Sequence, residues 1–185
     1  MPWHLLVFNF LLFQGLWLVA VTLGDSVALL LFIPALALHF MYLRRVFAQQ
    51  FLWRNELLLI TLIMLLGFGV EYLAIVLNVW GDTTSTLPPV FLVLLWAGFG
   101  MTLHVSFGFL HNKLWLSAVL GGLFAPLSYS AGAALNPTLE LADTLTSLSI
   151  VAAIWACVFP LLIYCAARLP LLKIATAAPT TKAVA

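Results

Sequence analysis

The chain has 185 residues, of which 65% are hydrophobic and 7% are charged. Soluble domains carry roughly 25% charged residues, so seven basic and six acidic side chains cannot cover a water-exposed surface of this size. A formal net charge of +1 without a basic stripe also excludes nucleic acid as a partner. The composition therefore predicts an integral membrane protein surrounded by the lipid bilayer.

Six apolar segments are long enough to cross about 30 Å of hydrocarbon at about 1.5 Å per residue. In chain order they are Leu5–Leu23, Ser26–Leu43, Leu57–Leu77, Pro89–Leu110, Leu114–Ala134 and Ser147–Ala167. The first two are separated only by Gly24 and Asp25, which predicts an antiparallel hairpin. We expect an all-α fold, a polytopic six-transmembrane helical bundle over residues 1–170, followed by a disordered cytoplasmic tail over residues 171–185.

Charges alternate between the two sides of this predicted bundle. With six crossings, all seven basic residues fall on one side: Arg44, Arg45, Arg54, Lys113, Arg168, Lys173 and Lys182. Four acidic residues fall on the other side: Asp25, Asp82, Glu140 and Asp143. Basic residues collect on the cytoplasmic side of membrane proteins, so the pattern predicts that both termini are cytoplasmic.

An outer polar layer is centred on Glu71, which lies about 9 Å deep in the third segment. A carboxylate in hydrocarbon costs roughly 2–4 kcal/mol, so this side chain should face the bundle or a cavity. Residues at similar depth on other segments are Gln14, Trp17, Trp96, Tyr129 and Trp155. One interpretation is a ligand, proton or cation site in an aromatic box; the other is a carboxyl group that ties helices together.

An inner polar layer contains Asn9, His39 and His104, about 6–10 Å from the cytoplasmic surface. His39 and His104 could serve as haem or metal ligands from two helices. Alternatively, they hydrogen-bond neighbouring helices or interfacial water. The depths of Glu71 and His104 differ by about 10 Å, so the two side chains should not pair directly.

The sequence contains no catalytic motif that would indicate an enzyme. The sequence has no Ser/His/Asp grouping, no phosphate-binding glycine loop and no paired inner carboxylates. Cys157 and Cys165 both lie in the last apolar segment and are expected to act as small hydrophobic residues. We therefore assign no catalytic residue and no metal ligand, and no cofactor beyond the alternative at His39 and His104.

Three stretches, NFLLFQGLWLVAVTLG (residues 9–24), WAGFGMTLHVSFGFL (residues 96–110) and APLSYSAG (residues 125–132), resemble a small proteobacterial inner-membrane family classed as a domain of unknown function. By that likeness the family-typical positions are Asn9, Gln14, His104, Pro126, Tyr129 and Gly132, with an acidic residue near Glu71. The chain departs from the family pattern at Leu103, where the resemblance leads us to expect Asn. The resemblance implies a multi-pass protein of the bacterial inner (plasma) membrane. Members often stand near genes for lipid-modifying enzymes, which implies a lipid-related role by association.

Three classes of function follow from these observations. The first is a non-enzymatic membrane protein that binds or moves a lipid or small amphiphile through the Glu71 layer. The second is a membrane redox or lipid-modifying enzyme subunit with a histidine site at His39 and His104. The third is a non-catalytic helper of another membrane protein, in which both polar layers hold helices together.

Overall fold

The structure, a computed structural model, describes residues 1–81 and 85–173, and these residues form an all-helical fold. Its elements are α1 (Trp3–Phe47), η1 (Ala48–Gln50), α2 (Trp53–Val76), α3 (Val90–Gly100), η2 (Gly108–Leu110), α4 (Leu114–Leu135) and α5 (Thr144–Arg168). Outside the helices, the only strand-like pairings among the described residues are two isolated bridges. The predicted all-α fold class is confirmed.

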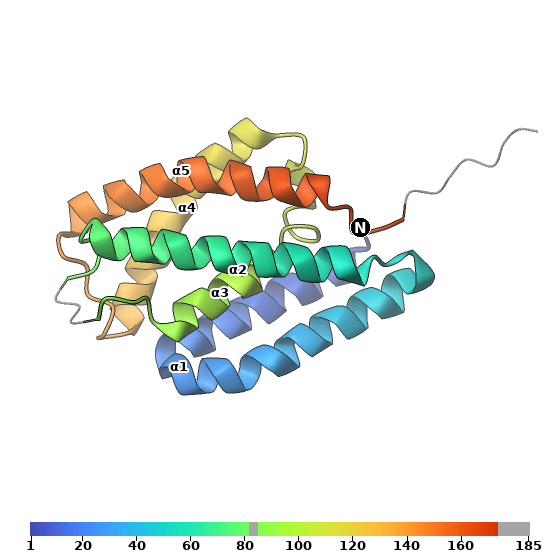
Figure 1. Ribbon diagram of the computed structural model, residues 1–185, viewed down its shortest axis with the longest axis horizontal. Coiled ribbons are helices and arrows are strands. Elements are labelled where there is room, and N and C mark those ends of the chain that lie inside the picture. The colour runs from blue at the N-terminus through green and yellow to red at the C-terminus, as the bar shows by residue number, and fades with distance from the viewer. Residues whose placement is uncertain (82–84, 174–185) are drawn as a thin grey trace, which may run out of the picture.

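Helix α1 is divided into two arms at Gly24, which has φ 74° and ψ −164°. Glycine adopts this backbone conformation readily because glycine has no Cβ atom. In Figure 1 the chain doubles back at this point, so that residues 3–23 and 25–47 form a hairpin. The tight helical hairpin expected from the short Gly24–Asp25 connection is therefore present.

Four helices are long and apolar enough to cross a membrane: α1 together with η1, α2, α4 and α5. Helix α3 has only 11 residues, which corresponds to about 16 Å along its axis. The predicted span Pro89–Leu110 is thus wrong as a continuous helix, because residues 101–107 form turns. Side chains from other elements donate hydrogen bonds to carbonyl groups of this segment; Asn9, for example, donates to the carbonyl oxygen of Met101. Such bonds give the backbone hydrogen-bond partners where it is not helical.

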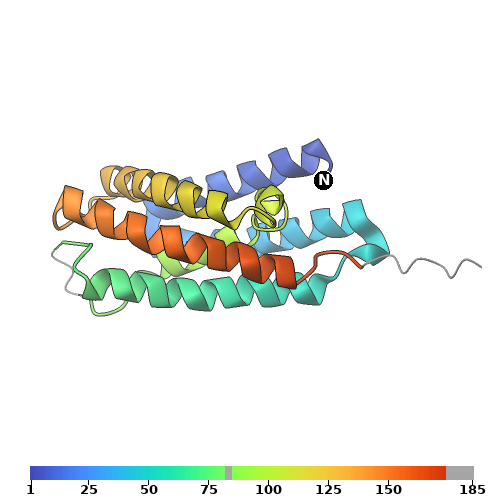
Figure 2. The same cartoon turned by 90° about the horizontal axis from the view of Figure 1, so that it is seen from above.

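The helices pack in two groups that meet around α3. Helix α3 contacts both α1 and α2, whereas α4 pairs with α5, and Figure 2 shows α4 and α5 running side by side. Gly121 makes the second pairing close, because a Cβ atom there would lie 2.5 Å from the carbonyl oxygen of Trp155. At the N-terminus of α3, the backbone N–H of Phe91 donates to Asp25 Oδ1 at 2.8 Å. Asp25 in the α1 turn therefore caps α3 and fixes the two elements together.

Residues 171–173, which follow α5, pack and pair with the chain near the end of α1. Leu171 is buried, Leu172 pairs with Phe51, and the backbone N–H of Lys173 donates to Gln50. Leu171 and Leu172 thereby complete a small apolar cluster around the end of α1. Residues 174–185, which include Lys182, lie outside the described part of the chain, as does Asp82.

Candidate functional site

Glu71 is the centre of a polar site between α2, α3 and α4. Its side chain is buried, with the residue 2% exposed. The indole N–H of Trp96 donates to Glu71 Oε1 at 2.9 Å, and the hydroxyl of Tyr129 donates to the same oxygen at 2.5 Å. The second oxygen, Oε2, is buried without a hydrogen-bond partner. Half of the carboxyl group is thus held in place, and half is left without a protein partner.

The sequence around Glu71 creates room for these partners. Gly67 lies one turn before Glu71, and a Cβ atom there would lie 2.0 Å from Cγ of Trp96. The absence of a side chain at Gly67 lets Trp96 approach α2 closely and reach the carboxyl group. Tyr129 comes three residues after Pro126 on α4, and its hydroxyl reaches Glu71 as the sequence predicts.

A cavity of about 330 Å³ adjoins this carboxyl group. Two stacked aromatic pairs form part of its wall: Trp80 with Tyr129, at a centroid distance of 5.3 Å, and Trp96 with Trp155, at 4.7 Å. Other aromatic residues on its lining are Phe13, Trp17, Phe99, Phe107, Phe124 and Phe159. The cavity is therefore an aromatic chamber with one carboxyl group in its wall.

Two further polar atoms of this chamber lack partners. The indole N–H groups of Trp80 and Trp155 are buried and make no hydrogen bond. Together with Glu71 Oε2, they are the only buried side-chain nitrogen or oxygen atoms without a partner in residues 1–81 and 85–173, and all three residues line the cavity. Buried polar atoms are normally satisfied, so the concentration of these three atoms distinguishes the chamber from the rest of the described core.

The structure brings together most of the residues predicted for the outer layer. Trp17, Trp96, Tyr129 and Trp155 line the cavity with Glu71. Gln14 does not: it is exposed on the first arm of α1. Counting residues along the helix does not give the face on which a side chain lies, and here Phe13 and Trp17 share the cavity-facing side.

Trp80 also lines the chamber but was not among the residues predicted from the sequence, whereas Trp3, Trp53 and Trp115 do not line it. The other three are at least half exposed, whereas Trp80 is 3% exposed and stacks on Tyr129. No local pattern distinguishes it, since its burial comes from the return of residues 139–142 over the end of α2. The bridge between Trp80 and Leu141 shows this contact.

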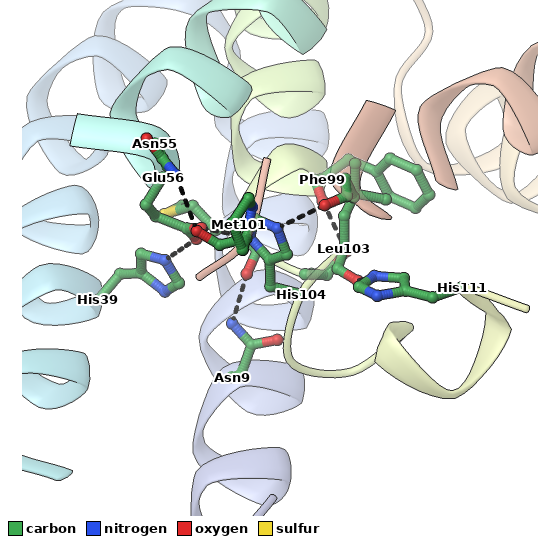
Figure 3. Close-up of polar contacts among 12 residues, drawn as sticks. Asn9, His39, Asn55, Glu56, Phe99, Met101, Leu103, His104 and His111 are labelled. Carbon is green, nitrogen blue, oxygen red and sulfur yellow. Dashed lines mark hydrogen bonds and ion pairs between the residues drawn. The ribbon is translucent and has the colours of Figure 1, made fainter. Parts of the chain in front are cut away.

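A second polar centre lies at the start of α2, around Glu56 (Figure 3). Its two oxygens meet different histidines: Oε1 lies 2.8 Å from His39 Nε2, and Oε2 lies 2.5 Å from His104 Nδ1. The other ring nitrogen of His104 lies 3.0 Å from the carbonyl oxygen of Ala166. The cluster therefore ties the second arm of α1, the start of α2, the segment after α3 and the end of α5 at one point.

Neighbouring side chains support the irregular segment that carries His104. Asn9 donates to the carbonyl oxygen of Met101 at 3.0 Å and accepts from the Ser106 hydroxyl at 2.6 Å. A ring nitrogen of His111 lies 3.2 Å from the carbonyl oxygen of Leu103. Partial burial lowers the pKa of His111. These contacts satisfy backbone groups that a continuous helix would have paired internally.

The predicted inner layer of Asn9, His39 and His104 is present, but its centre was missed. Glu56 was not among the residues predicted for this layer. Helical spacing could have found it: 11 residues, close to three full turns, separate Glu56 from Gly67 on the buried face of α2. As predicted, Glu71 and His104 have separate partners.

Haem or metal ligation by His39 and His104 does not fit this geometry. Both ring nitrogens of His104 already have oxygen partners, and the Glu56 carboxyl group lies between the two rings. In the described ranges, no group of three or more His, Cys, Asp or Glu side chains is arranged to hold a metal ion. The described arrangement is a carboxylate that contacts two histidines.

Fold and site define an all-helical protein whose long apolar helices suit a membrane, with one buried carboxyl group near each end of α2. Residues 6–161 match the family described as protein of unknown function, DUF2878, and the chain belongs to this family. The matched range contains Glu56, Glu71 and every residue of the aromatic chamber. Comparison with curated proteins and with solved structures gave no match.

Proposed function

We propose that this chain is a multi-pass membrane protein that binds, and in doing so can move, a lipid or small amphiphile in the aromatic chamber beside Glu71. The observation that carries this proposal is the buried, unpartnered Oε2 atom of Glu71 in a cavity of about 330 Å³. That volume falls within the range of about 300–1,000 Å³ typical of small-molecule sites. The mostly apolar wall with a few polar atoms is also typical of such sites.

A six-pass topology supports this proposal. The two arms of α1 are about 31 Å and about 35 Å long, enough for one crossing each. Helix α3 and the turns after it would form the fourth pass. Irregular backbone is tolerated at membrane depth where protein buries it or it lines a cavity, and the segment after α3 meets the first condition through Asn9 and His111.

Charge placement supports an orientation with both termini in the cytoplasm. Arg45, Arg54 and Arg168 lie at helix ends near the Glu56 centre, whereas Asp25 and Asp143 lie at the opposite ends of their helices. By the positive-inside rule, the Glu56 centre faces the cytoplasm and the Glu71 chamber lies toward the other side. We propose the bacterial inner membrane as the location of this arrangement.

Binding is favoured over catalysis by the chemistry of the chamber. Among the described lining residues, Glu71 and Tyr129 are the only titratable side chains, and they bond to each other. Such a pair can recognise and orient a polar group. It provides neither a nucleophile with its base nor a second carboxyl group for acid–base work.

Native mass spectrometry of the protein in mild detergent tests the proposal. The wild type should retain a lipid or amphiphile that Glu71→Gln loses, because the variant keeps the shape of the side chain and removes its charge. Glu140→Gln is the matched control, since Glu140 is exposed in the loop before α5. A bare wild-type protein would contradict the proposal, and a co-purified membrane protein in its place would favour the helper function.

A further inference from the structure

We propose that the ligand of the aromatic chamber is an organic monocation, an amine or quaternary ammonium group with an apolar body. This inference rests on the proposed binding function and adds the charge of the ligand. It is carried by three features of the chamber: the donors that surround Glu71, the absence of a basic partner for its carboxylate, and the aromatic faces on its walls.

The polar groups around Glu71 suit an ionised carboxylate. Trp96 and Tyr129 both donate to Oε1. An indole N–H can only donate, and a carboxylate that accepts several donors is stabilised in its charged form. These two donors therefore stabilise the ionised form of Glu71, provided that a positive charge balances it.

The described lining of the chamber supplies no positive charge. Among the described residues that line the chamber there is no Lys, Arg or His. A buried charge is costly unless it is paired. The missing partner of Oε2 is therefore best provided by a cation that enters with the ligand.

The walls suit an organic cation better than a metal ion. Ring faces attract ammonium groups, most strongly where water is excluded, and the pairs Trp80–Tyr129 and Trp96–Trp155 present several rings. Calcium would require about six to eight oxygen ligands. The described side chains of the lining offer oxygens only from Glu71, Ser128 and Tyr129.

Binding of the cation would exchange it for a proton. Burial without a counter-charge favours the neutral acid, so the proton on Glu71 leaves to bulk solvent as the cation arrives, and the charge of the chamber is conserved. Tyr129 is the only other titratable group that faces Glu71 among the described lining residues, and its hydroxyl stays a donor throughout. Affinity for the cation should therefore rise with pH.

Choline and its uncharged carbon isostere, 3,3-dimethylbutan-1-ol, provide a matched pair of probes. Isothermal titration of the full-length protein in detergent should show choline binding at least about tenfold tighter than the isostere. Glu71→Gln should lose this preference, whereas Glu140→Gln should retain it. Titration of choline in buffers of different ionisation enthalpy should show release of a proton in the wild type.

Two results would overturn the inference. Equal binding of both probes by the wild type would remove the requirement for charge, while leaving the chamber as a binding site. Binding of neither probe, together with a neutral lipid retained in native mass spectra, would also overturn it. In either case the native mass spectra of wild type and Glu71→Gln decide the proposed function separately, so the two failures are distinguishable.

Discussion

Helix α2 carries two buried carboxyl groups that differ in how completely they are satisfied. Glu56 and Glu71 are 15 residues apart, or about 22 Å along the helix. Both oxygens of Glu56 have histidine partners. Only one oxygen of Glu71 has partners, and the other is buried in the wall of a cavity.

Under the proposed function, this difference separates a structural role for Glu56 from a binding role for Glu71. A buried charge that the protein satisfies completely holds its helices in one arrangement, and removing either partner leaves the other unpaired. A buried carboxyl group with a free oxygen beside a cavity stabilises the protein less than it could, and its unmet bonding capacity is available to a ligand. The Glu56 centre should therefore control stability, and the Glu71 chamber should control ligand binding.

The largest expected effect is the loss of stability in Glu56→Gln. Breaking a buried ion pair costs about 3–5 kcal/mol, because the amide keeps only one accepting oxygen for His39 and His104 and removes the negative charge between them. Chemical unfolding in detergent micelles, followed by circular dichroism, measures this change. Glu71→Gln should change the free energy of unfolding by less than about 1 kcal/mol, since Oε1 still accepts from Trp96 and Tyr129. A larger loss in Glu71→Gln than in Glu56→Gln would reverse the assignment of roles.

Much of the Glu71 site was predictable because position along a helix can be counted. An isolated acid in an apolar segment is costly, and aromatic residues at equal depth on other segments had to lie near it. Trp96 and Tyr129 were placed correctly on this basis. The count fixes the level of a residue but not its direction around the helix axis, which is why Gln14 was included and proved to be exposed.

The break after α3 could not be read from hydropathy. Residues 89–110 are apolar enough for a continuous span, yet the chain leaves the helix after Gly100. The partner of the Met101 carbonyl is Asn9, 92 residues earlier in the chain. A contact this distant overrides local helix preference, so neither the break nor the burial of Glu56 beside His104 follows from any single segment.

A substitution at Gly67 tests whether the Glu71 chamber depends on the position of Trp96, because Gly67 lets Trp96 reach Glu71. Gly67→Ala places a methyl group within 2.0 Å of the ring and must displace it, at a cost of about 1–3 kcal/mol in overpacking. Ligand retention in native mass spectra should fall sharply. Gly69→Ala on the same helix is the control, because nothing lies within 4 Å of the added carbon. Equal retention in the two variants would show that the position of the Trp96 ring is not required.

Tyr129→Phe tests one hydrogen bond of the chamber without changing its shape. The variant keeps the ring that stacks on Trp80 and removes the hydroxyl that donates to Glu71. A hydrogen bond to a charged group contributes about 1.5–3 kcal/mol, so choline affinity should fall by roughly tenfold or more. Tyr72→Phe, which alters an exposed tyrosine beside Glu71 in the sequence, should leave the affinity unchanged. A matching loss in both variants would remove the specific role of Tyr129.

The smallest effect is expected at Asp143, a carboxyl group outside both centres. It caps α5 by accepting from the backbone N–H of Thr146 at 2.8 Å. The side chain of Thr146, together with this backbone N–H, lowers the pKa of Asp143 below its ordinary value of 3.8. Because the folded-state pKa is lowered, the contribution to stability is complete above 3.8 and is lost as the pH falls through the lower folded-state pKa.

Asp143→Asn keeps the capping oxygen but does not titrate. Its unfolding midpoint should therefore depend less on pH in this acidic range than that of the wild type. Glu140→Gln changes a neighbouring exposed carboxyl group that caps no helix, and it should follow the wild-type curve. If Asp143→Asn also followed that curve, the loss of stability in acid would have to originate in the buried centres, and Glu56 would be the first group to examine, because its two histidine partners depend on its charge.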